Sequence, residues 1–453
     1  MHFELTKEFL EELKTKIADK DEVKVFQLVR DLHPADLAEI YKNLDEQESK
    51  FLYLLLDHEK AADMLLELED NDREKLLNAL PGEIIARQII GEMDSDDAAD
   101  VLGELSEEKQ EEVLQNIADL EHAGDIVDLL HYKENTAGGL MAKEVITVNE
   151  NWDIVTCIRE MRKQAEEIDE LYYVYVIDDD GILKGTLSLK RMLLTKTSAK
   201  IKNIQNSDII YVKTDTPSEE VAQIMEKYDL VSLPVVDAIG RLLGRITIDD
   251  VVDVIREEAE KDYQMISGIT EDVESTDKVW LLTRARLPWL LVGLVGGVFG
   301  SLVIANYELE LELYPQMAFF VPLVAAMGGN AGVQSSSIIV QSLASNSLGL
   351  ESTFQKLLKE LGVSLINGFI MAALILLYSY FATDSLPLTL TVSSSLLAVI
   401  ICASLFGTFI PLALNRFKID PALATGPFIT TFNDILGLFI YFVLGRIMYA
   451  VFL

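Results

Sequence analysis

One carboxylate stands apart in the C-terminal part of the chain. Asp434 is the only charged residue between Pro421 and Gly445, in a stretch that is otherwise apolar or neutral and long enough to cross a bilayer as a helix. A carboxylate at that depth is costly unless it faces water, an ion or a partner group. Arg446 is twelve residues further along, roughly 18 Å at helical rise, and is too distant to pair with it. Asp434 is therefore expected to line an ion pathway.

Glycines and neutral polar residues gather in two apolar stretches. The earlier stretch contains Gly328, Gly329, Asn330 and Gly332, and the last one carries Thr430, Thr431 and Asn433 before Asp434. Close helix packing would by itself explain such small residues. Thr430 and Asp434, however, are four residues apart and share one face of a helix. Because both stretches are polar, we interpret them as lining a hydrated pore.

A denser group of carboxylates lies in the N-terminal part, between Asp94 and Asp100. Asp96 and Asp100 are expected on one helix face, where like charges destabilise the helix unless something screens them. A bound cation could provide this screening. The surrounding segments 37–44, 61–68 and 98–105 align as one degenerate unit, which predicts an array of helical repeats. The acidic residues at the equivalent position of the first two units, Glu39 and Asp63, are interpreted as solvated.

Charge divides the chain into two parts. Residues 283–453 hold 7 of the 38 Lys and Arg residues and 8 of the 74 Asp and Glu residues, which leaves residues 1–282 with 31 basic and 66 acidic side chains. A part this acidic repels nucleic acid and attracts cations. Cys157 and Cys402 lie in different parts, and the five His are scattered, so neither a disulfide nor a transition-metal site is predicted. No phosphate-binding loop or nucleophile with an adjacent base is present, so an enzyme is not expected.

Five apolar stretches predict five membrane-spanning helices. The first four extend from Leu287 to Tyr307, from Leu313 to Leu350, from Leu361 to Thr383 and from Ser385 to Asn415, and the fifth contains Asp434. Basic residues precede the first stretch and follow the second and fourth, whereas the loops around Glu310 and Asp384 have none. The positive-inside rule then predicts a cytoplasmic N-terminal part and an external C-terminus. An odd number of spans excludes two equal inverted halves, which favours a pore between two identical subunits.

Two similar units of strand, helix, strand, strand and helix are predicted between Ala137 and Asp262. In each unit a strand ends in Asp, at Asp178 and Asp237, and a glycine turn follows, which is a hairpin signal. The pair resembles tandem cystathionine-β-synthase-type (CBS) domains, which are regulatory modules that often bind nucleotides or ions. Arg191 occupies in the first unit the place that Asp250 has in the second, which disfavours a nucleotide in the first cleft. A strongly acidic helix from Asp249 to Gln264 leads from the second unit to the first span.

The order of these parts resembles the MgtE family of magnesium channels over essentially the whole chain. The resemblance rests on the acidic helical domain, the two CBS units, the acidic connecting helix and the GGNAG and TTFND motifs of the spans. It implies a homodimer in the lipid bilayer of the plasma membrane, with a magnesium-selective filter built from Asp434 of each subunit. The run around Asn330 would lie nearby. ATP binding by the CBS units is a further implication.

The resemblance also implies regulatory Mg²⁺ ions between carboxylates of the cytoplasmic part. These carboxylates are Asp96 and Asp100 of the N-terminal domain, Glu219, Asp229, Asp250 and Asp253 of the CBS units, and Glu258 and Asp262 of the connecting helix. Clustered carboxylates repel one another, by about 4 kcal/mol for two unit charges 4 Å apart at an effective dielectric constant of 20. We therefore expect cytoplasmic Mg²⁺ to compact this part and to close the pore, and low Mg²⁺ to release it.

The expected fold is a multidomain membrane protein. Its predicted parts are an all-α N-terminal domain at 1–133, α+β CBS domains at 134–199 and 200–255, a connecting (plug) helix at 256–282 and a transmembrane pore domain of five helices at 283–453. Two other functions remain open from the sequence. The membrane part could be a secondary transporter coupled to sodium or protons, or the chain could be a membrane-anchored sensor of Mg²⁺ or nucleotide without transport.

Overall fold

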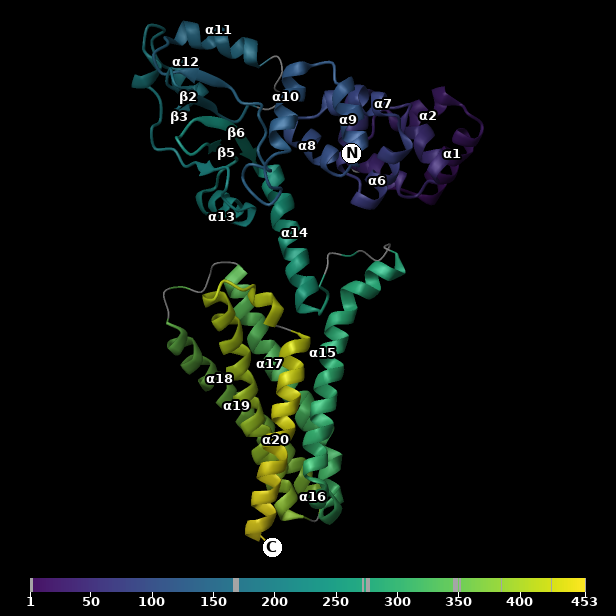
Figure 1. Cartoon of the computed structure of the whole chain (residues 1–453), viewed down its shortest axis with the longest axis vertical. Coiled ribbons are helices and arrows are strands. Elements are labelled where there is room, and N and C mark those ends of the chain that lie inside the picture. Colours follow the sequence, from purple (N-terminus) through teal and green to yellow (C-terminus); the bar gives the residue numbers. More distant parts are fainter. Residues whose placement is uncertain are drawn as a thin grey trace. The chain divides into compact units, whose positions relative to one another are not determined.

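The computed structural model describes residues 3–165, 171–270, 273, 278–344, 349, 352–383, 385–424 and 426–452. Asp384, which the sequence places in an external loop, lies outside these residues. The chain forms two compact units, Met1–Arg256 and Glu257–Leu453 (Figure 1). The first unit contains the acidic domains and the second contains the apolar helices.

Short helices build the N-terminal domain, as the repeats predict. They are α1 (Lys7–Ala18), α2 (Glu22–Val29), α3 (Pro34–Tyr41), α4 (Glu46–Tyr53), α5 (His58–Leu66), α6 (Asp70–Ala79), α7 (Gly82–Gln88), the 3₁₀ turn η1 (Ile90–Glu92), α8 (Ser95–Gly103), α9 (Glu107–Asn116) and α10 (Leu120–Leu129). The three aligned segments begin at the fourth residue of α3, α5 and α8. Their first residues, Leu37, Ala61 and Ala98, are all buried, so each repeat places the same apolar face in the core.

Two small sheets with the same topology follow. The first unit contains β1 (Thr147–Asn149), α11 (Ile154–Gln164), β2 (Val174–Ile177), β3 (Leu183–Leu187), α12 (Leu189–Leu193) and the 3₁₀ turn η2 (Ile201–Asn203). The second contains β4 (Val212–Lys213), α13 (Ser218–Tyr228), β5 (Ser232–Val236), β6 (Leu242–Thr247) and α14 (Ile248–Ile266).

In each sheet the middle strand is parallel to the first strand and antiparallel to the last, in the orders β1-β2-β3 and β4-β5-β6. Gly181 and Gly240 turn the two hairpins with φ of 80° and 92°, a backbone conformation that favours glycine. The tandem CBS arrangement predicted from the sequence is confirmed.

The second unit begins within α14 and continues into long apolar helices. These are α15 (Val279–Asn306), the short α16 (Glu308–Leu313), the 3₁₀ turn η3 (Pro315–Phe320), α17 (Val321–Ala344), α18 (Thr353–Ala382), α19 (Leu386–Arg416), the 3₁₀ turn η4 (Pro421–Ala424) and α20 (Pro427–Phe452). Among the described residues, five helices are long and apolar enough to cross a membrane, which confirms the five predicted spans. α18 begins eight residues before the predicted apolar run and includes Lys356, Lys359 and Glu360.

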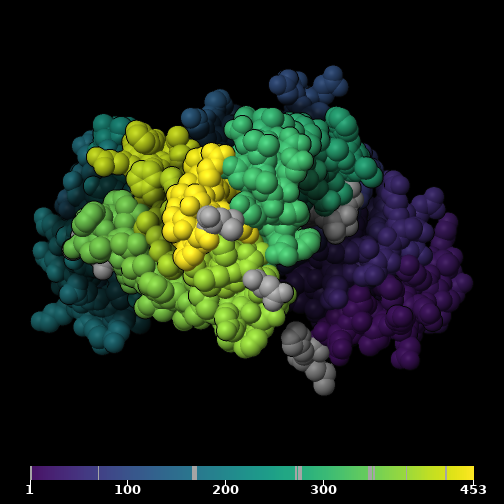
Figure 2. All heavy atoms as spheres, turned by 90° about the horizontal axis from the view of Figure 1, so that it is seen from below, coloured from purple at the N-terminus to yellow at the C-terminus, as the bar shows by residue number. Residues whose placement is uncertain are grey.

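α19 is the central helix of this bundle. Half of its most apolar window is buried, against 11% for α15 and α18, which therefore lie at the periphery of the protomer. α17 and α20 pack against α19 and against each other, and α20 also packs against α15. Viewed from the end of the bundle, α20 (yellow) lies between α15 (teal-green) and α19 (yellow-green) (Figure 2). The predicted pore-lining spans, α17 and α20, are thus in direct contact.

Candidate ion pathway and regulatory carboxylates

The glycines of α17 bring its backbone against α20 at Asp434. Asp434 is half-buried, and a Cβ built on Gly329 would lie 3.4 Å from its Oδ1 atom and 3.1 Å from Cγ2 of Thr430. Thr430 Oγ1 donates a hydrogen bond to the Gly426 carbonyl oxygen at 3.0 Å, which fixes its methyl group toward α17. Thr430 and Asp434 therefore lie on the same side of α20, as predicted, and Gly329 provides the space beside them.

Thr431 faces α15, and Asn433 faces α17 one turn away from Gly329. A Cβ on Gly296 of α15 would overlap the side chain of Thr431, so Gly296 accommodates that residue. Asn433 is buried against Gly332 of α17, and neither its amide nitrogen nor its amide oxygen has a hydrogen-bond partner among the described residues. Gly328 is buried against the Asn433 backbone. In the protomer these residues pack the helices around Asp434.

α17 also has an exposed polar face. Asn330 and Gln334 are exposed on the protomer and lie four residues apart, with the exposed Ile338 one turn further. Amide side chains that face hydrocarbon lose hydrogen bonds to water, so residues of this type within spans normally face a polar cavity or another protein surface. This face of α17 is accordingly the part of the bundle that requires water or a partner.

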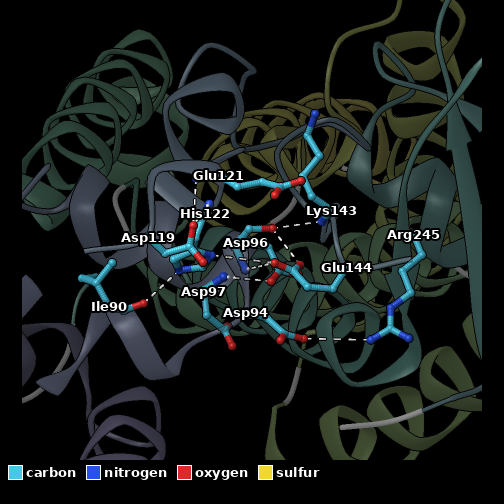
Figure 3. A network of polar contacts seen from close by, with 11 residues as sticks. Ile90, Asp94, Asp96, Asp97, Asp119, Glu121, His122, Lys143, Glu144 and Arg245 are labelled. Carbon is cyan, nitrogen blue, oxygen red and sulfur yellow. Dashed lines mark hydrogen bonds and ion pairs between the residues drawn. The ribbon is translucent and has the colours of Figure 1, made fainter. Parts of the chain in front are cut away.

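A second group of carboxylates forms around the first turn of α8 (Figure 3). Oxygen atoms of Asp94, Asp96 and Glu144 lie within 4.8 Å of one another. Ser95 donates two hydrogen bonds to the Glu144 carboxylate, one from its backbone N–H at 3.2 Å and one from its hydroxyl at 2.8 Å. Asp96 is 8% exposed, so this group combines a buried carboxylate with two more accessible ones. Oxygen ligands of this kind suit a hard divalent cation.

Two basic side chains border this group. Arg245 of β6 lies 3.9 Å from Asp94, and His122 of α10 has its Nδ1 atom 4.0 Å from Glu144. The His122 Nε2 atom lies 3.0 Å from the Ile90 carbonyl oxygen, which orients the ring. The N-terminal domain and the second CBS unit thus both contribute to the network in Figure 3.

The same carboxylates lie close to Asp250 of α14. Burial, together with the negative charges of Asp250, Asp97 and Asp94, raises the pKa of Asp96 well above its usual range. Burial and then the charge of Asp250 raise the pKa of Asp97 to about 7.

Asp250 lies in a similarly unfavourable environment for a carboxylate. Burial and the charge of Asp249 raise its pKa to about 6, although Thr247 donates hydrogen bonds to it from its backbone N–H at 3.1 Å and its hydroxyl at 2.8 Å. Acidic residues are favoured in the first turn of a helix. Here, however, the acidic first turns of α8 and α14 lie close together. Asp96 and Asp250 therefore lie close to each other in the first unit.

The other predicted regulatory ligands are more dispersed. Asp100 is exposed one turn after Asp96, Glu219 and Asp253 are exposed on α13 and α14, and Asp229 is exposed in the left-handed position that ends α13. Glu258 lies 3.3 Å from the Lys261 amine, and Asp262 follows one turn later on α14. Within the first unit, desolvation and then the negative charges of Glu134 and Asp250 raise the pKa of Asp100 to about 7, so Asp100 lies near the α8 carboxylates.

Two carboxylates were not singled out by the sequence. Glu144 follows the helical repeats in a segment without periodicity, so only the fold shows that it reaches α8. Glu360 precedes an apolar run and accepts a hydrogen bond at 2.7 Å from Ser335, three residues after Gly332. Its position directly before that run was a possible signal, since a carboxylate there must find a polar partner.

These features define a membrane protein with five spans, one carboxylate at the contact of two polar spans, and an acidic part with tandem CBS domains. Comparison with family models agrees. The MgtE model, described as a divalent cation transporter, matches residues 321–444, the MgtE intracellular N domain matches 32–135, and the CBS domain matches 137–195 and 201–257. The chain belongs to the MgtE family, as the resemblance of its motifs indicated.

Relatives cover nearly the whole chain. It is 33% identical to the magnesium transporter MgtE of Thermus thermophilus over 96% of this chain and 97% of that protein. The magnesium transporter MgtE of Bacillus subtilis is 31% identical over 92% of each chain.

Two solved structures resemble the acidic part of this chain. One is the soluble part of a magnesium transporter, with a TM-score of 0.50 and 31% identity, which covers 56% of this chain and 99% of that one. The other is the cytosolic domain of the Mg²⁺ channel MgtE in complex with ATP, with a TM-score of 0.51 and 33% identity, which covers 54% and 99%.

Proposed function

We propose that this protein is a homodimeric, magnesium-selective channel that imports Mg²⁺ across the plasma membrane and is closed by cytoplasmic Mg²⁺. The observation that carries the proposal is Asp434, a carboxylate in the middle of a span, beside Thr430 and the glycine face of α17. The magnesium transporters that are similar over nearly the full chain support Mg²⁺ as the transported ion.

Magnesium chemistry fits a filter of this kind. Mg²⁺ gives up its water molecules reluctantly and prefers octahedral oxygen coordination. Two Asp434 carboxylates, one from each subunit, would hold a largely hydrated ion through its waters, and selectivity would then follow from hydrated size and charge. Thr430, Thr431 and Asn433 would shape the α20 wall at this level, directly or through packing. Gly328 and Gly329 would shape the opposite wall.

The exposed face of α17 supports the homodimer. Asn330 and Gln334 are exposed on the protomer within a membrane span. Pairing of two protomers through a twofold axis would place both faces around one aqueous path and remove the amides from lipid. The distribution of basic residues supports a cytoplasmic N-terminal part and an external C-terminus.

Regulation by cytoplasmic Mg²⁺ is supported by the carboxylates around α8 and α14. Asp94, Asp96, Asp97 and Asp250 lie close enough for each to disfavour ionisation of its neighbours. A divalent cation between them would replace repulsion by attraction and would stabilise the compact arrangement that binds it. Asp100, Glu219, Asp229, Asp253, Glu258 and Asp262 would supply further sites as the domains approach one another.

We also propose that one of the two CBS units binds a nucleotide. The similar cytosolic domain solved with ATP supports an ATP site in the CBS units. In the first unit, Arg191 donates a hydrogen bond to the Ile204 carbonyl oxygen at 3.0 Å, so its guanidinium is already engaged. We therefore place ATP in the second unit.

Flux into liposomes that contain the native chain or Asp434→Ala tests the proposal, with Mg²⁺ titrated on the cytoplasmic face. We expect flux in the native chain that falls as cytoplasmic Mg²⁺ rises, and none in Asp434→Ala. Equal flux in the two proteins would remove Asp434 from the pathway. Slow, saturating flux that requires a sodium or proton gradient would identify a coupled transporter, and absence of flux in both folded proteins would favour a sensor.

A further inference from the structure

An apolar groove opens between α18 and α19 at the end of the bundle where α18 begins. Its volume is about 350 Å³, and its walls include Phe354, Leu358 and Leu361 of α18 and Leu405 and Phe409 of α19. Phe354 is 73% exposed and Leu358 is 57% exposed, so these side chains face the surroundings of the protomer. A groove of this size accommodates part of one hydrocarbon chain.

Basic residues surround this end of the groove. Arg416 lies seven residues after Phe409, two turns along the same face of α19 and roughly 10 Å away at helical rise. Lys418 follows the end of α19. Lys356 and Lys359 lie in the first two turns of α18, on the face opposite to Leu358 and Leu361, so they add positive charge to this end without lining the groove. None of the four forms an ion pair with another described residue. The positive end of the α18 dipole lies at the same level.

A second groove on α18 provides an internal comparison. It lies at the other end of the helix, has a volume of about 510 Å³ and is lined by residues that include Leu374, Leu377 and Phe381. No Lys or Arg occurs between Lys359 and Arg416 in the sequence. Both grooves suit an acyl chain, but only the first combines an apolar wall with unpaired positive charge on the elements that form it.

We propose that the groove between the start of α18 and the end of α19 is a binding site for an anionic phospholipid. One acyl chain lies along Leu358, Leu361 and Leu405, and the phosphate group lies at Arg416 and Lys418. Basic clusters at the ends of spans attract anionic headgroups, and long basic side chains reach the headgroup level while their stems stay in the apolar region. The acyl chain of a zwitterionic lipid fits the groove equally well, but its headgroup is attracted less strongly to the basic side chains.

The site adjoins the proposed ion pathway. Glu360 precedes Leu361 of the groove and accepts the 2.7 Å hydrogen bond from Ser335 of α17. A lipid that fixes the first turns of α18 therefore also fixes α17 beside its glycines. This second step rests on the proposed transport function, and it predicts that phosphatidylglycerol raises or lowers flux in the native chain but has a smaller effect in Ser335→Ala.

Native mass spectrometry of the full chain tests the lipid site, with phosphatidylglycerol and phosphatidylcholine of identical acyl chains as probes. We expect preferential retention of phosphatidylglycerol by the native chain. The preference should fall roughly fivefold for each charge removed in the Arg416→Gln and Lys418→Gln double variant. Leu405→Trp should reduce retention of both lipids by filling the groove. Arg416→Lys, which keeps the charge, should retain the preference and shows that the position tolerates substitution.

Arg286→Gln is the matched control, because it removes one positive charge from α15, which lies across the bundle from α18 (Figure 1). A loss of preference in Arg286→Gln as large as the loss per charge in the double variant would show diffuse attraction to the whole basic end and would overturn the site. So would an unchanged preference in the double variant, or a changed oligomeric mass in Leu405→Trp, since the groove would then be a contact between protomers. If phosphatidylglycerol is retained as expected but no vesicle shows flux, the transport proposal fails and the lipid site stands.

Discussion

At the scale of single residues, a close backbone approach between α17 and α19 depends on Gly407. A Cβ at this position would overlap the Gly332 carbonyl oxygen, and neither backbone can move without separating α17 from α19. We predict that Gly407→Ala lowers the free energy of unfolding by about 1–3 kcal/mol, the usual cost of overpacking. Thermal unfolding in detergent measures this change.

Gly362→Ala on α18 is the control for that prediction, because nothing lies within 4 Å of a Cβ built there. Alanine is the better helix former by up to about 1 kcal/mol, so this variant should be neutral or slightly more stable. Equal destabilisation by the two substitutions would mean that glycine content, rather than the contact at Gly332, determines stability.

The carboxylates around Asp97 predict how stability depends on pH in the absence of metal. Their pKa values in the folded protein are raised, to about 7 for Asp97 and about 6 for Asp250. The folded state therefore holds these protons more tightly than the unfolded chain does, and ionisation destabilises it. In EDTA, we expect the melting temperature of the first unit, Met1–Arg256, to fall as the pH rises from about 4 to about 7 and to stay constant above pH 7.

Saturating Mg²⁺ should remove or reverse this slope, because ligand carboxylates must lose their protons to bind metal. Scanning calorimetry or fluorescence at several pH values gives the measurement, at about 2–4 °C for each kcal/mol lost. The variant Asp97→Asn should flatten the slope in EDTA. A melting temperature that rises between pH 5 and 7 without metal would contradict the proposed crowding of ionised carboxylates.

Residue types in the sequence indicated the candidate ion pathway more readily than the candidate regulatory site. Asp434 was evident because a carboxylate is rare in a span, and its position beside Thr430 follows from helical periodicity alone. The approach of Asp250 to Asp96 depends on how the second CBS unit packs against the helical domain, which no local pattern contains. Glu144 and Arg245 join the network for the same reason and have no signal of their own in the sequence.

At the scale of elements, the polar face of α17 should matter for flux and not for folding. Asn330 and Gln334 are exposed on the protomer, so their replacement removes no internal contact. We predict that Asn330→Leu with Gln334→Leu reduces Mg²⁺ flux about tenfold or more, since a tenfold change in rate corresponds to about 1.4 kcal/mol, the order of one lost hydrogen bond.

The control for that variant is Ile338→Leu, an apolar change on the same face. It should leave both flux and melting temperature unchanged. Flux measured in liposomes and stability measured in detergent separate the two effects. Normal flux after loss of both amides would place the pathway elsewhere, and loss of folding would show that this face packs within the dimer.

Helices and strands whose residues repeat with a clear period could be predicted from the sequence, but the residues at which they begin and end could not. The repeats predicted α3, α5 and α8 in phase, and the hairpin glycines predicted both CBS sheets. α18 begins eight residues before the apolar run from Leu361 to Thr383, because apolar composition marks only the span, whereas lysines can remain helical where a span leaves the membrane. Glu360 was missed for the same reason, although it is the residue that joins α18 to α17.

At the scale of the whole molecule, charge is separated along the chain. The acidic excess lies in residues 1–282, whereas the spans and their loops are nearly neutral. A large like charge favours separation of domains, and a divalent counter-ion opposes it. Under the proposed regulation, this excess of negative charge would oppose tight packing at low Mg²⁺ and would make the compact state responsive to Mg²⁺, without requiring any single strong site.

This view predicts the behaviour of the triple variant Asp250→Asn, Asp253→Asn and Glu258→Gln. In the native chain, protease resistance of the cytoplasmic part should rise with Mg²⁺, because ions bind the compact state more tightly. In EDTA, the variant should resist proteolysis better than the native chain, because repulsion between its carboxylates is reduced. It should respond to Mg²⁺ only at concentrations about tenfold higher or more, which corresponds to a loss of about 1.4 kcal/mol of coupling. Inhibition of flux by cytoplasmic Mg²⁺ should weaken in parallel.

The matched control removes three negative charges from exposed positions of the N-terminal helices, in Glu8→Gln, Glu39→Gln and Glu59→Gln. Both triple variants change the net charge equally, so they separate total charge from location. If the control shifts the Mg²⁺ response as far as the first variant does, compaction follows the overall charge and no bridging at α14 is needed. If only the variant at α14 shifts, and flux inhibition shifts with protease resistance, the compact state and the closed pore are one state, because two independent transitions would not respond together to the same three carboxylates.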